Sequence, residues 1–189
     1  RRFIGAMRSG NSAAYLAIIL MTIGPFARII DKIVSFFVNR NVAYRDDDLP
    51  LCIVLVGPPR SGSTVIYQML VRALPCVYIS NLHVLFPNIA SRYLLKKGLF
   101  ALRHTCIKNY YGHTSHIYDV NEGNELLKVL FRDGDANESI RKRFIRFVSQ
   151  IKATRDRPLI FKNVGAYSNI YCLHEAVPEI IFIRIKRDI

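Results

Sequence analysis

Four short apolar runs, each rich in β-branched or aromatic residues, divide most of the chain into regular sections. They lie at Ile53–Val56, Val77–Ile79, Leu159–Phe161 and Ile180–Ile183. Runs of this length and composition predict buried strands, and the segments between them repeat apolar residues at helical spacing. Buried strands that alternate with helices indicate a parallel sheet covered on both faces. We therefore expect an α/β fold with a central parallel sheet and three layers over residues 51–189.

The segments between the strands predict several helices. The helix after the first strand is expected to bury one face, made of Ile66, Met69, Leu70 and Ala73. A later helix, capped near Asp135–Asn137, carries a longer apolar stripe of Ile140, Phe144, Phe147, Val148 and Ile151. Basic residues flank this stripe and are expected on a solvated face: Arg141, Lys142, Arg143 and Arg146. Helices are also expected at Pro87–His104, at Glu125–Phe131 and in a segment that ends near Pro178, and a polar loop is expected at Asn109–Asn124.

The first fifty residues differ from the rest and are expected to form a separate helical segment with a linker. Ala13–Ile23 is almost entirely apolar, and Gly24-Pro25 interrupts the run. The residues after Pro25 have an amphipathic helical pattern, so the segment is expected to pack on the domain or to contact a membrane surface through residues 13–38. A transmembrane anchor stays open as an alternative, although the run is short for a bilayer span.

The net charge of the chain limits the kinds of ligand or partner that we expect. The chain has 189 residues with 27 Lys and Arg against 14 Asp and Glu, a net charge of +13. This excess favours an anionic ligand, nucleic acid or an acidic membrane surface, and a generally basic surface is the simpler alternative. The basic residues are dispersed rather than interleaved with aromatic residues, so nucleic acid is not expected. The compartment stays open between the cytoplasm and a membrane surface.

Cysteine usage gives no sign of a metal site or of disulfides. The four cysteines are far apart and include no CxxC pair. We expect buried, reduced thiols, above all at Cys52 and Cys172, which have apolar surroundings.

The first strand leads directly into a glycine-containing loop, Gly57–Thr64 (GPPRSGST), and then into a helix. Such a loop can bind a phosphate group, because backbone N–H groups and the helix dipole converge there. Its spacing matches the Walker A pattern except that Ser63 occupies the lysine position. A nucleotide kinase or triphosphatase needs that lysine, so this function is kept only as an alternative. The strong cation within the loop is Arg60.

Basic side chains follow several predicted strands. Arg60, His83, Lys162 and Arg187 each lie at or near the carboxyl end of such a strand. Because the carboxyl ends of parallel strands share one edge of the sheet, we expect these side chains to converge on one crevice. Like charges that converge repel one another unless an anion lies among them, so the crevice is expected to bind an anion.

Three blocks of the sequence resemble the sulfotransferases that use 3′-phosphoadenosine-5′-phosphosulfate (PAPS), with the closest likeness to bacterial-type members. Gly57–Thr64 resembles the family's 5′-phosphosulfate loop, commonly written PRSGTT. Pro158–Asn163 resembles the strand with an active-site lysine, and Ile181–Asp188 resembles the start of the 3′-phosphate motif. The later adenine-contacting and acceptor-binding segments of the family are not in this sequence, so we expect this stretch to bind the nucleotide poorly by itself.

The resemblance implies a function: transfer of a sulfuryl group from PAPS to a hydroxyl of a carbohydrate, lipid or other small acceptor, without a metal. It assigns the 5′-phosphosulfate to a set of loop residues: Pro59, Arg60, Ser61, Gly62, Ser63 and Thr64. Arg187 would pair with the 3′-phosphate, and Arg60 with Lys162 would neutralise the leaving group. A protein that binds an anionic ligand without catalysis stays open as an alternative.

The general base is not fixed by the resemblance. Val164 stands where the cytosolic subgroup has a catalytic histidine. Two candidates remain: Glu122, in the polar loop, and His83, after the second strand. Each has a structural alternative, an ion pair for Glu122 and a helix cap for His83.

Overall fold

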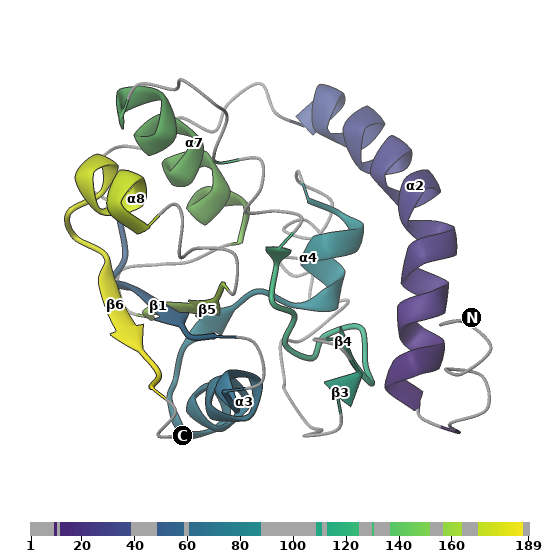
Figure 1. Cartoon of the computed structure of the whole chain (residues 1–189). Coiled ribbons are helices and arrows are strands. Elements are labelled where there is room, and N and C mark those ends of the chain that lie inside the picture. Colours follow the sequence, from purple (N-terminus) through teal and green to yellow (C-terminus); the bar gives the residue numbers. More distant parts are fainter. Residues whose placement is uncertain are drawn as a thin grey trace. The chain divides into compact units, whose positions relative to one another are not determined.

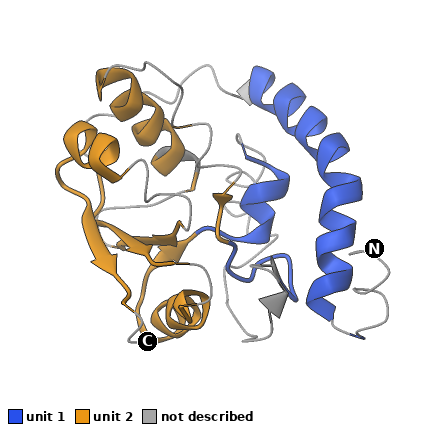
Figure 2. Cartoon of the chain, in the orientation of Figure 1, with its two compact units in different colours: residues 1–42, 79–121 blue, residues 43–78, 122–189 orange. Residues whose placement is uncertain are grey.

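The structure is a computed structural model that describes residues 10, 12–38, 49–58, 61–87, 109–110, 113–124, 130, 137–151, 157–163 and 170–186. The chain divides into two compact units (Figure 2). Unit 1 comprises residues 1–42 and 79–121, and unit 2 comprises residues 43–78 and 122–189. The boundary that we predict near residue 50 concerns domains and stays a prediction.

Unit 2 is built on a four-stranded sheet with the order β2-β5-β1-β6. Its strands are β1 (Cys52–Val56), β2 (Val77–Tyr78), β5 (Leu159–Lys162) and β6 (Ile181–Arg184), and every pairing is parallel. The predicted α/β fold with a central parallel sheet is confirmed. All residues of β5 are buried, as expected for an apolar strand inside such a sheet.

Helices cover both faces of this sheet (Figure 1). On one face lies α3 (Ser63–Ala73), whose Tyr67 hydroxyl donates a 3.2 Å hydrogen bond to the carbonyl of Ile160. On the other lie α7 (Asn137–Gln150) and α8 (Ile170–Ala176). The ring of Phe161 packs between this sheet and α7, with centroids 6.5 Å from Phe144 and 6.0 Å from Phe147. The predicted apolar stripe of α7 is confirmed, because its members are all buried: Ile140, Phe144, Phe147, Val148 and Ile151.

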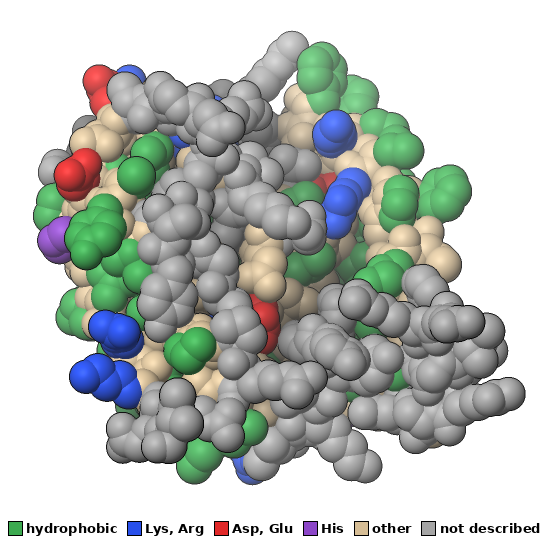
Figure 3. All heavy atoms as spheres, viewed as in Figure 1, with side chains coloured by type: hydrophobic (Ala, Val, Ile, Leu, Met, Phe, Trp, Pro, Cys, Tyr) green, Lys and Arg blue, Asp and Glu red, His purple; other side chains and the backbone are tan. Residues whose placement is uncertain are grey.

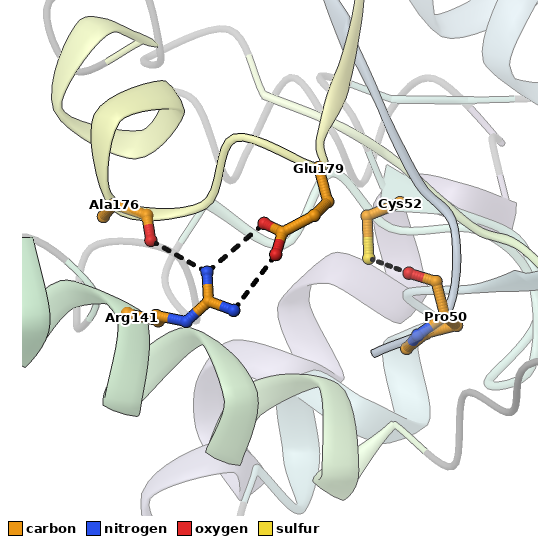
Figure 4. A network of polar contacts seen from close by, with 5 residues as sticks. All are labelled: Pro50, Cys52, Arg141, Ala176 and Glu179. Carbon is orange, nitrogen blue, oxygen red and sulfur yellow. Dashed lines mark hydrogen bonds and ion pairs between the residues drawn. The ribbon is translucent and has the colours of Figure 1, made fainter. Parts of the chain in front are cut away.

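We predict that the basic residues along α7 face solvent, and this prediction is wrong for Arg141 and Arg143. The guanidinium of Arg141 donates to both carboxylate oxygens of Glu179, at 3.0 and 3.2 Å, and to the carbonyl of Ala176 (Figure 4). Arg143 donates to the carbonyl of Leu130 at 3.0 Å. Lys142 is exposed and pairs with Glu138 one turn away. Two of the flanking residues therefore tie α7 to neighbouring segments rather than face water.

The predicted apolar face of α3 is not the side of the helix that packs on the sheet. Ile66 and Met69 are 38% and 59% exposed, whereas Tyr67, Gln68 and Val71 are buried. Apolar residues lie on more than one side of this helix, so tertiary packing selects the residues that are buried. The buried amide of Gln68 has no hydrogen-bond partner among the described residues.

The prediction of buried cysteine side chains is confirmed for Cys52 but not for Cys172. Cys52 is buried, its thiol contacts the carbonyl of Pro50 at 3.3 Å (Figure 4), and burial raises its pKa to about 12. Cys172 is exposed, which corrects the prediction for that residue. In the part of the chain that the structure describes, Cys52, Cys76 and Cys172 form no disulfide.

Unit 1 contains α2 (Ser12–Val38), α4 (Asn81–Leu85) and a short antiparallel pair, β3 (Asn109–Tyr110) with β4 (His113–Thr114). The helix α2 continues through Gly24-Pro25, where we predicted an interruption, and it bends along its length (Figure 1). The segment that we predicted as one polar loop contains β3, β4 and a tight turn. The helices predicted at Pro87–His104 and Glu125–Phe131 lie almost entirely outside the described residues.

Candidate active site

In unit 2 the loop after β1 leads into the first turn of α3, and we call Ser61, Gly62, Ser63 and Thr64 the cradle. Gly62 is the N-cap of α3, with a left-handed backbone (φ 76°) and no side-chain cap. A glycine fits this conformation without strain, and it gives the N–H groups at the start of the helix no side-chain cap, although the Val65 N–H donates to the Gly62 carbonyl at 3.0 Å. The helix dipole adds partial positive charge at the same place. Ser63, in the position of the Walker lysine, is 3% exposed and begins the helix.

The loop folds back tightly on its own start. A Cβ at Gly57 would lie 2.9 Å from the Ser61 hydroxyl and 3.2 Å from the Cβ of Ile185, so glycine alone fits without a shift of its neighbours. The Ser61 hydroxyl is buried and has no hydrogen-bond partner among the described residues. A buried hydroxyl without a partner is costly, and an anion bound in the loop would supply the acceptor. The residues present therefore fit a phosphate or phosphosulfate group.

A lysine from the sheet extends to the first turn of α3. Lys162 ends β5, where it is paired with Leu55 of β1, and its side chain is 3% exposed. Its ammonium donates a 2.8 Å hydrogen bond to the Thr64 hydroxyl and forms an ion pair with Glu122. The Thr64 hydroxyl in turn donates to Glu122 Oε1 at 2.9 Å. We call Thr64, Glu122 and Lys162 the polar triad.

The electrostatics of the polar triad depend on its burial. Lys162 is 3% exposed and Glu122 is 14% exposed. Water can therefore solvate neither charge well, and each depends on the other for compensation. The second oxygen of Glu122 is 3.4 Å from the amide nitrogen of Asn124. Asn124 was not predicted as a site residue, and its sequence context gives no signal for this contact.

His83 lies in unit 1 and has a structural role there. It is the third residue of α4, and its Nδ1 lies 2.8 Å from the Ser80 hydroxyl and 3.1 Å from the Ser80 backbone nitrogen, a reciprocal cap. Complete burial lowers the pKa of His83 to about 4, so the ring is neutral at pH 7. Its Nε2 is buried without a hydrogen-bond partner among the described residues.

The remaining predicted site residues are only partly described. Pro59, Arg60 and Arg187 lie outside the described residues, so the predicted convergence of basic side chains on one crevice stays a prediction. Arg184 ends β6 beside Val56 of β1 and is exposed. Within the described ranges, no group of three or more His, Cys, Asp or Glu side chains could hold a metal ion.

Comparison with known proteins identifies solved structures with a similar fold. No protein-family model matches the sequence, and no curated protein matches it. The structure is similar to the sulfotransferase STF1 from Mycobacterium tuberculosis H37Rv, with a TM-score of 0.56 and 13% sequence identity over 98% of this chain and 59% of STF1. It is also similar to the sulfotransferase STF9 from Mycobacterium avium, with a TM-score of 0.48 and 16% identity over 94% of this chain and 49% of STF9. The chain thus spans less than two thirds of either protein, and its α/β fold is that of the sulfotransferase STF1.

Proposed function

We propose that the chain is the donor-binding part of a sulfotransferase, which transfers a sulfuryl group from PAPS to an acceptor hydroxyl. The observation that carries this proposal is the 2.8 Å contact between the Lys162 ammonium and the Thr64 hydroxyl, in the first turn of the cradle helix. A lysine from β5 thereby provides a cation at the place where Ser63 has replaced the lysine of a Walker A loop. The fold of STF1 supports the same reading.

The 5′-phosphosulfate would bind in the cradle. The N–H groups at the start of α3 and the Ser61 hydroxyl are donors that an anion needs there, and the Thr64 hydroxyl would join them once it turns from Glu122. From the sequence resemblance, Arg60 would add a cation within the loop, and Arg187 would pair with the 3′-phosphate.

Lys162 would act on the leaving group. As the acceptor oxygen forms its bond to sulfur, the bond between sulfur and the bridging phosphate oxygen breaks, and adenosine 3′,5′-bisphosphate leaves with the electron pair. Negative charge grows on the bridging oxygen, and an ammonium positioned beside it lowers the barrier. Lys162 is carried by a buried strand and its ammonium already contacts Thr64, so the step requires it to exchange its Glu122 partner for the bridging oxygen.

Glu122 would accept the proton of the acceptor hydroxyl. Its carboxylate touches Lys162 and Thr64, so it is close to the place where the sulfuryl group would bind. Once Lys162 turns to the bridging oxygen, Glu122 Oε1 is released from the ion pair and can act as a base. His83 is supported less well, because its Nδ1 is engaged by Ser80 and its ring is buried.

Donor binding is tested by calorimetry with adenosine 3′,5′-bisphosphate on the full-length protein in EDTA. We expect binding without a metal, which Arg60→Ala and Arg187→Ala each weaken roughly tenfold or more, since each removes a charge-assisted hydrogen bond. The matched control is Arg72→Ala, in the last turn of α3 and exposed, which should bind as the wild type does. A strict requirement for magnesium, or a preference for ATP, would refute the proposal.

The catalytic roles are tested by transfer of labelled sulfuryl groups from PAPS to a panel of carbohydrate, lipid and small-molecule hydroxyls. Lys162→Ala is expected to lower kcat roughly 10²–10³-fold and Glu122→Gln roughly 10²–10⁴-fold, with bisphosphate affinity nearly unchanged. Lys142→Ala, an exposed lysine on α7, is the control. Equal losses of affinity and turnover in Lys162→Ala would reduce it to a binding residue. An active Glu122→Gln with an inactive His83→Ala would move the base to His83.

A further inference from the structure

The helix α2 has two unlike sides. One side is buried within unit 1 and consists mainly of small residues, with Ala13, Ala14 and Ala17 at most 4% exposed. Further along the same side, Leu20 and Ala27 form a buried cluster with Leu85 of α4, against which pack Leu16, Phe86 and Ile117. This side fixes how α2 is rotated about its own axis within unit 1.

The other side is apolar and exposed. We call it the α2 face, and its residues are Ile19, Met21, Ile23, Phe26, Ile29, Ile30, Ile33, Phe36 and Phe37, each between 48% and 75% exposed. The stretch from Ile19 to Phe37 is roughly 27 Å long at the rise of an α-helix. Figure 3 shows apolar side chains along α2 with basic side chains among them. A continuous apolar surface of this size on a folded protein indicates an interaction site.

The exposed charges of α2 are all positive. Arg28 and Lys32 are exposed, whereas Asp31, the acidic residue of the helix, is 0% exposed. By helical spacing, Arg28 and Lys32 lie at one edge of the α2 face, where long basic side chains can extend to lipid headgroups. The sequence adds Arg1, Arg2 and Arg8 before the helix and a net charge of +13 over the chain. Charge complementarity therefore favours an anionic partner.

We propose that the α2 face docks the protein on an anionic membrane surface, with α2 lying in the interface plane. The helix is long and apolar enough to cross a membrane by length and composition. Spanning, however, would require it to leave the buried contacts of its small-residue side and to take Asp31 into lipid. In an interfacial position, α2 keeps the buried contacts of its small-residue side, and Asp31 stays out of the lipid.

A second copy of the chain is the main competitor. Ile19, Ile23, Phe26, Ile30, Ile33 and Phe37 are spaced by alternating steps of four and three, as in a coiled-coil seam. The α2 face is wider than a seam, since Ile29 and Phe36 lie beside it and are also more than half exposed. Pairing through this seam would also leave out Arg28 and Lys32, which lie on other sides of the helix by the same spacing. A bilayer with anionic headgroups can cover the whole width of the α2 face, and its headgroups can neutralise Arg28 and Lys32.

The test is flotation of the full-length protein with vesicles of equal parts phosphatidylglycerol and phosphatidylcholine, and with pure phosphatidylcholine. We expect binding to the anionic vesicles that Phe26→Ser/Phe37→Ser weakens roughly a hundredfold, about tenfold for each buried phenylalanine. Arg28→Gln/Lys32→Gln should weaken it roughly fivefold for each charge, and only on the anionic vesicles. The matched control is Tyr171→Ser, an aromatic residue of α8 that is 78% exposed.

Three results would overturn the proposal. One is vesicle binding by the phenylalanine variant equal to that of the wild type. Another is a lipid-free dimer, measured by light scattering, which the same variant splits while vesicle binding is absent. The third is retention of the protein in cell membranes after alkaline carbonate extraction, which would indicate a spanning helix. Bisphosphate binding should be unchanged in all these variants, so this test is independent of the proposed enzymatic function.

Discussion

The ion pair between Lys162 and Glu122 leads to a quantitative prediction about stability. Glu122→Gln keeps the shape of the side chain and an oxygen that can accept the Thr64 hydrogen bond, but it leaves the Lys162 ammonium without a counter-charge at 3% exposure. Lys162→Met keeps most of the side-chain volume and leaves the Glu122 carboxylate unpaired at 14% exposure. Each variant therefore isolates one buried charge.

The magnitude follows from the burial of the two groups. Removal of one partner from a buried ion pair costs about 3–5 kcal/mol. We expect about 3 kcal/mol for Glu122→Gln, because the remaining ammonium is almost fully buried. We expect about 2 kcal/mol for Lys162→Met, because the remaining carboxylate is more exposed and keeps the Thr64 donor. The double variant has no buried charge at this place, so its unfolding free energy should lie within about 1 kcal/mol of the wild type.

The assay is urea unfolding of the four proteins, followed by circular dichroism and by the fluorescence of the 10 tyrosines, since the chain has no tryptophan. The double-mutant cycle should give a coupling energy of about 4 kcal/mol, the difference between the two added losses and the small loss of the double variant. The exposed pair Glu138–Lys142, changed in the same two ways, is the control and should show little coupling. If the losses of the two single variants simply add in the double variant, Lys162 and Glu122 do not form a buried pair in solution.

Two further predictions concern the loop and unit 1. Gly57→Ala should lower the unfolding free energy by about 1–3 kcal/mol in the same urea assay and weaken bisphosphate binding, because its Cβ would crowd Ser61. A Gly57→Ala protein with wild-type stability and affinity would show that the loop does not need the close approach. Burial lowers the pKa of His83 from 6.5 to about 4, so between these values the unfolded chain takes up a proton that the folded chain does not, and stability should fall by about 3 kcal/mol as the pH drops through this interval. His83→Gln should flatten that part of the profile in urea unfolding at each pH, and a profile as steep as that of the wild type would contradict the burial of a neutral ring.

The strands and the helix α7 could be predicted from the sequence, because the pattern of their apolar residues fits one type of secondary structure and one buried side. The β-branched runs of β1, β5 and β6 match the structure within one or two residues, and the stripe of α7 has one apolar side only. The face of α3 could not be predicted in this way, since apolar residues lie on several of its sides and tertiary packing selects among them. The continuity of α2 through Pro25 has a similar cause. Pro25 removes one hydrogen bond, but the contacts of Leu20 before it and Ala27 after it hold both halves of the helix on unit 1.

The candidate site could likewise be predicted only in part. The loop and Lys162 were found from local sequence, because a glycine turn between a strand and a helix has a recognisable spacing. The contact of Lys162 with Thr64 joins residues 98 positions apart, and its contact with Glu122 joins residues 40 positions apart. No local pattern encodes such pairs. The sequence offers both Glu122 and His83 as candidates for the base, with a weak resemblance in favour of Glu122, and packing then separates a carboxylate beside the lysine from a ring that caps a helix.

The position of Lys162, the proposed catalytic lysine, depends on the register of the sheet. In a Walker A loop the lysine is fixed by its place in the loop, but here Ser63 has that place and the lysine comes from β5. Side chains alternate along a strand, so Phe161 packs on α7 while Lys162 points to α3. The pairing of Leu55 with Lys162 sets this alternation relative to the loop. A slip of one residue between β5 and β1 would bury the ammonium against the apolar face of α7 and place Phe161 in the cradle. The proposed catalytic cation is therefore held by the packing that forms the core, and the stability of the sheet and the chemistry of the site rest on the same strand pairing.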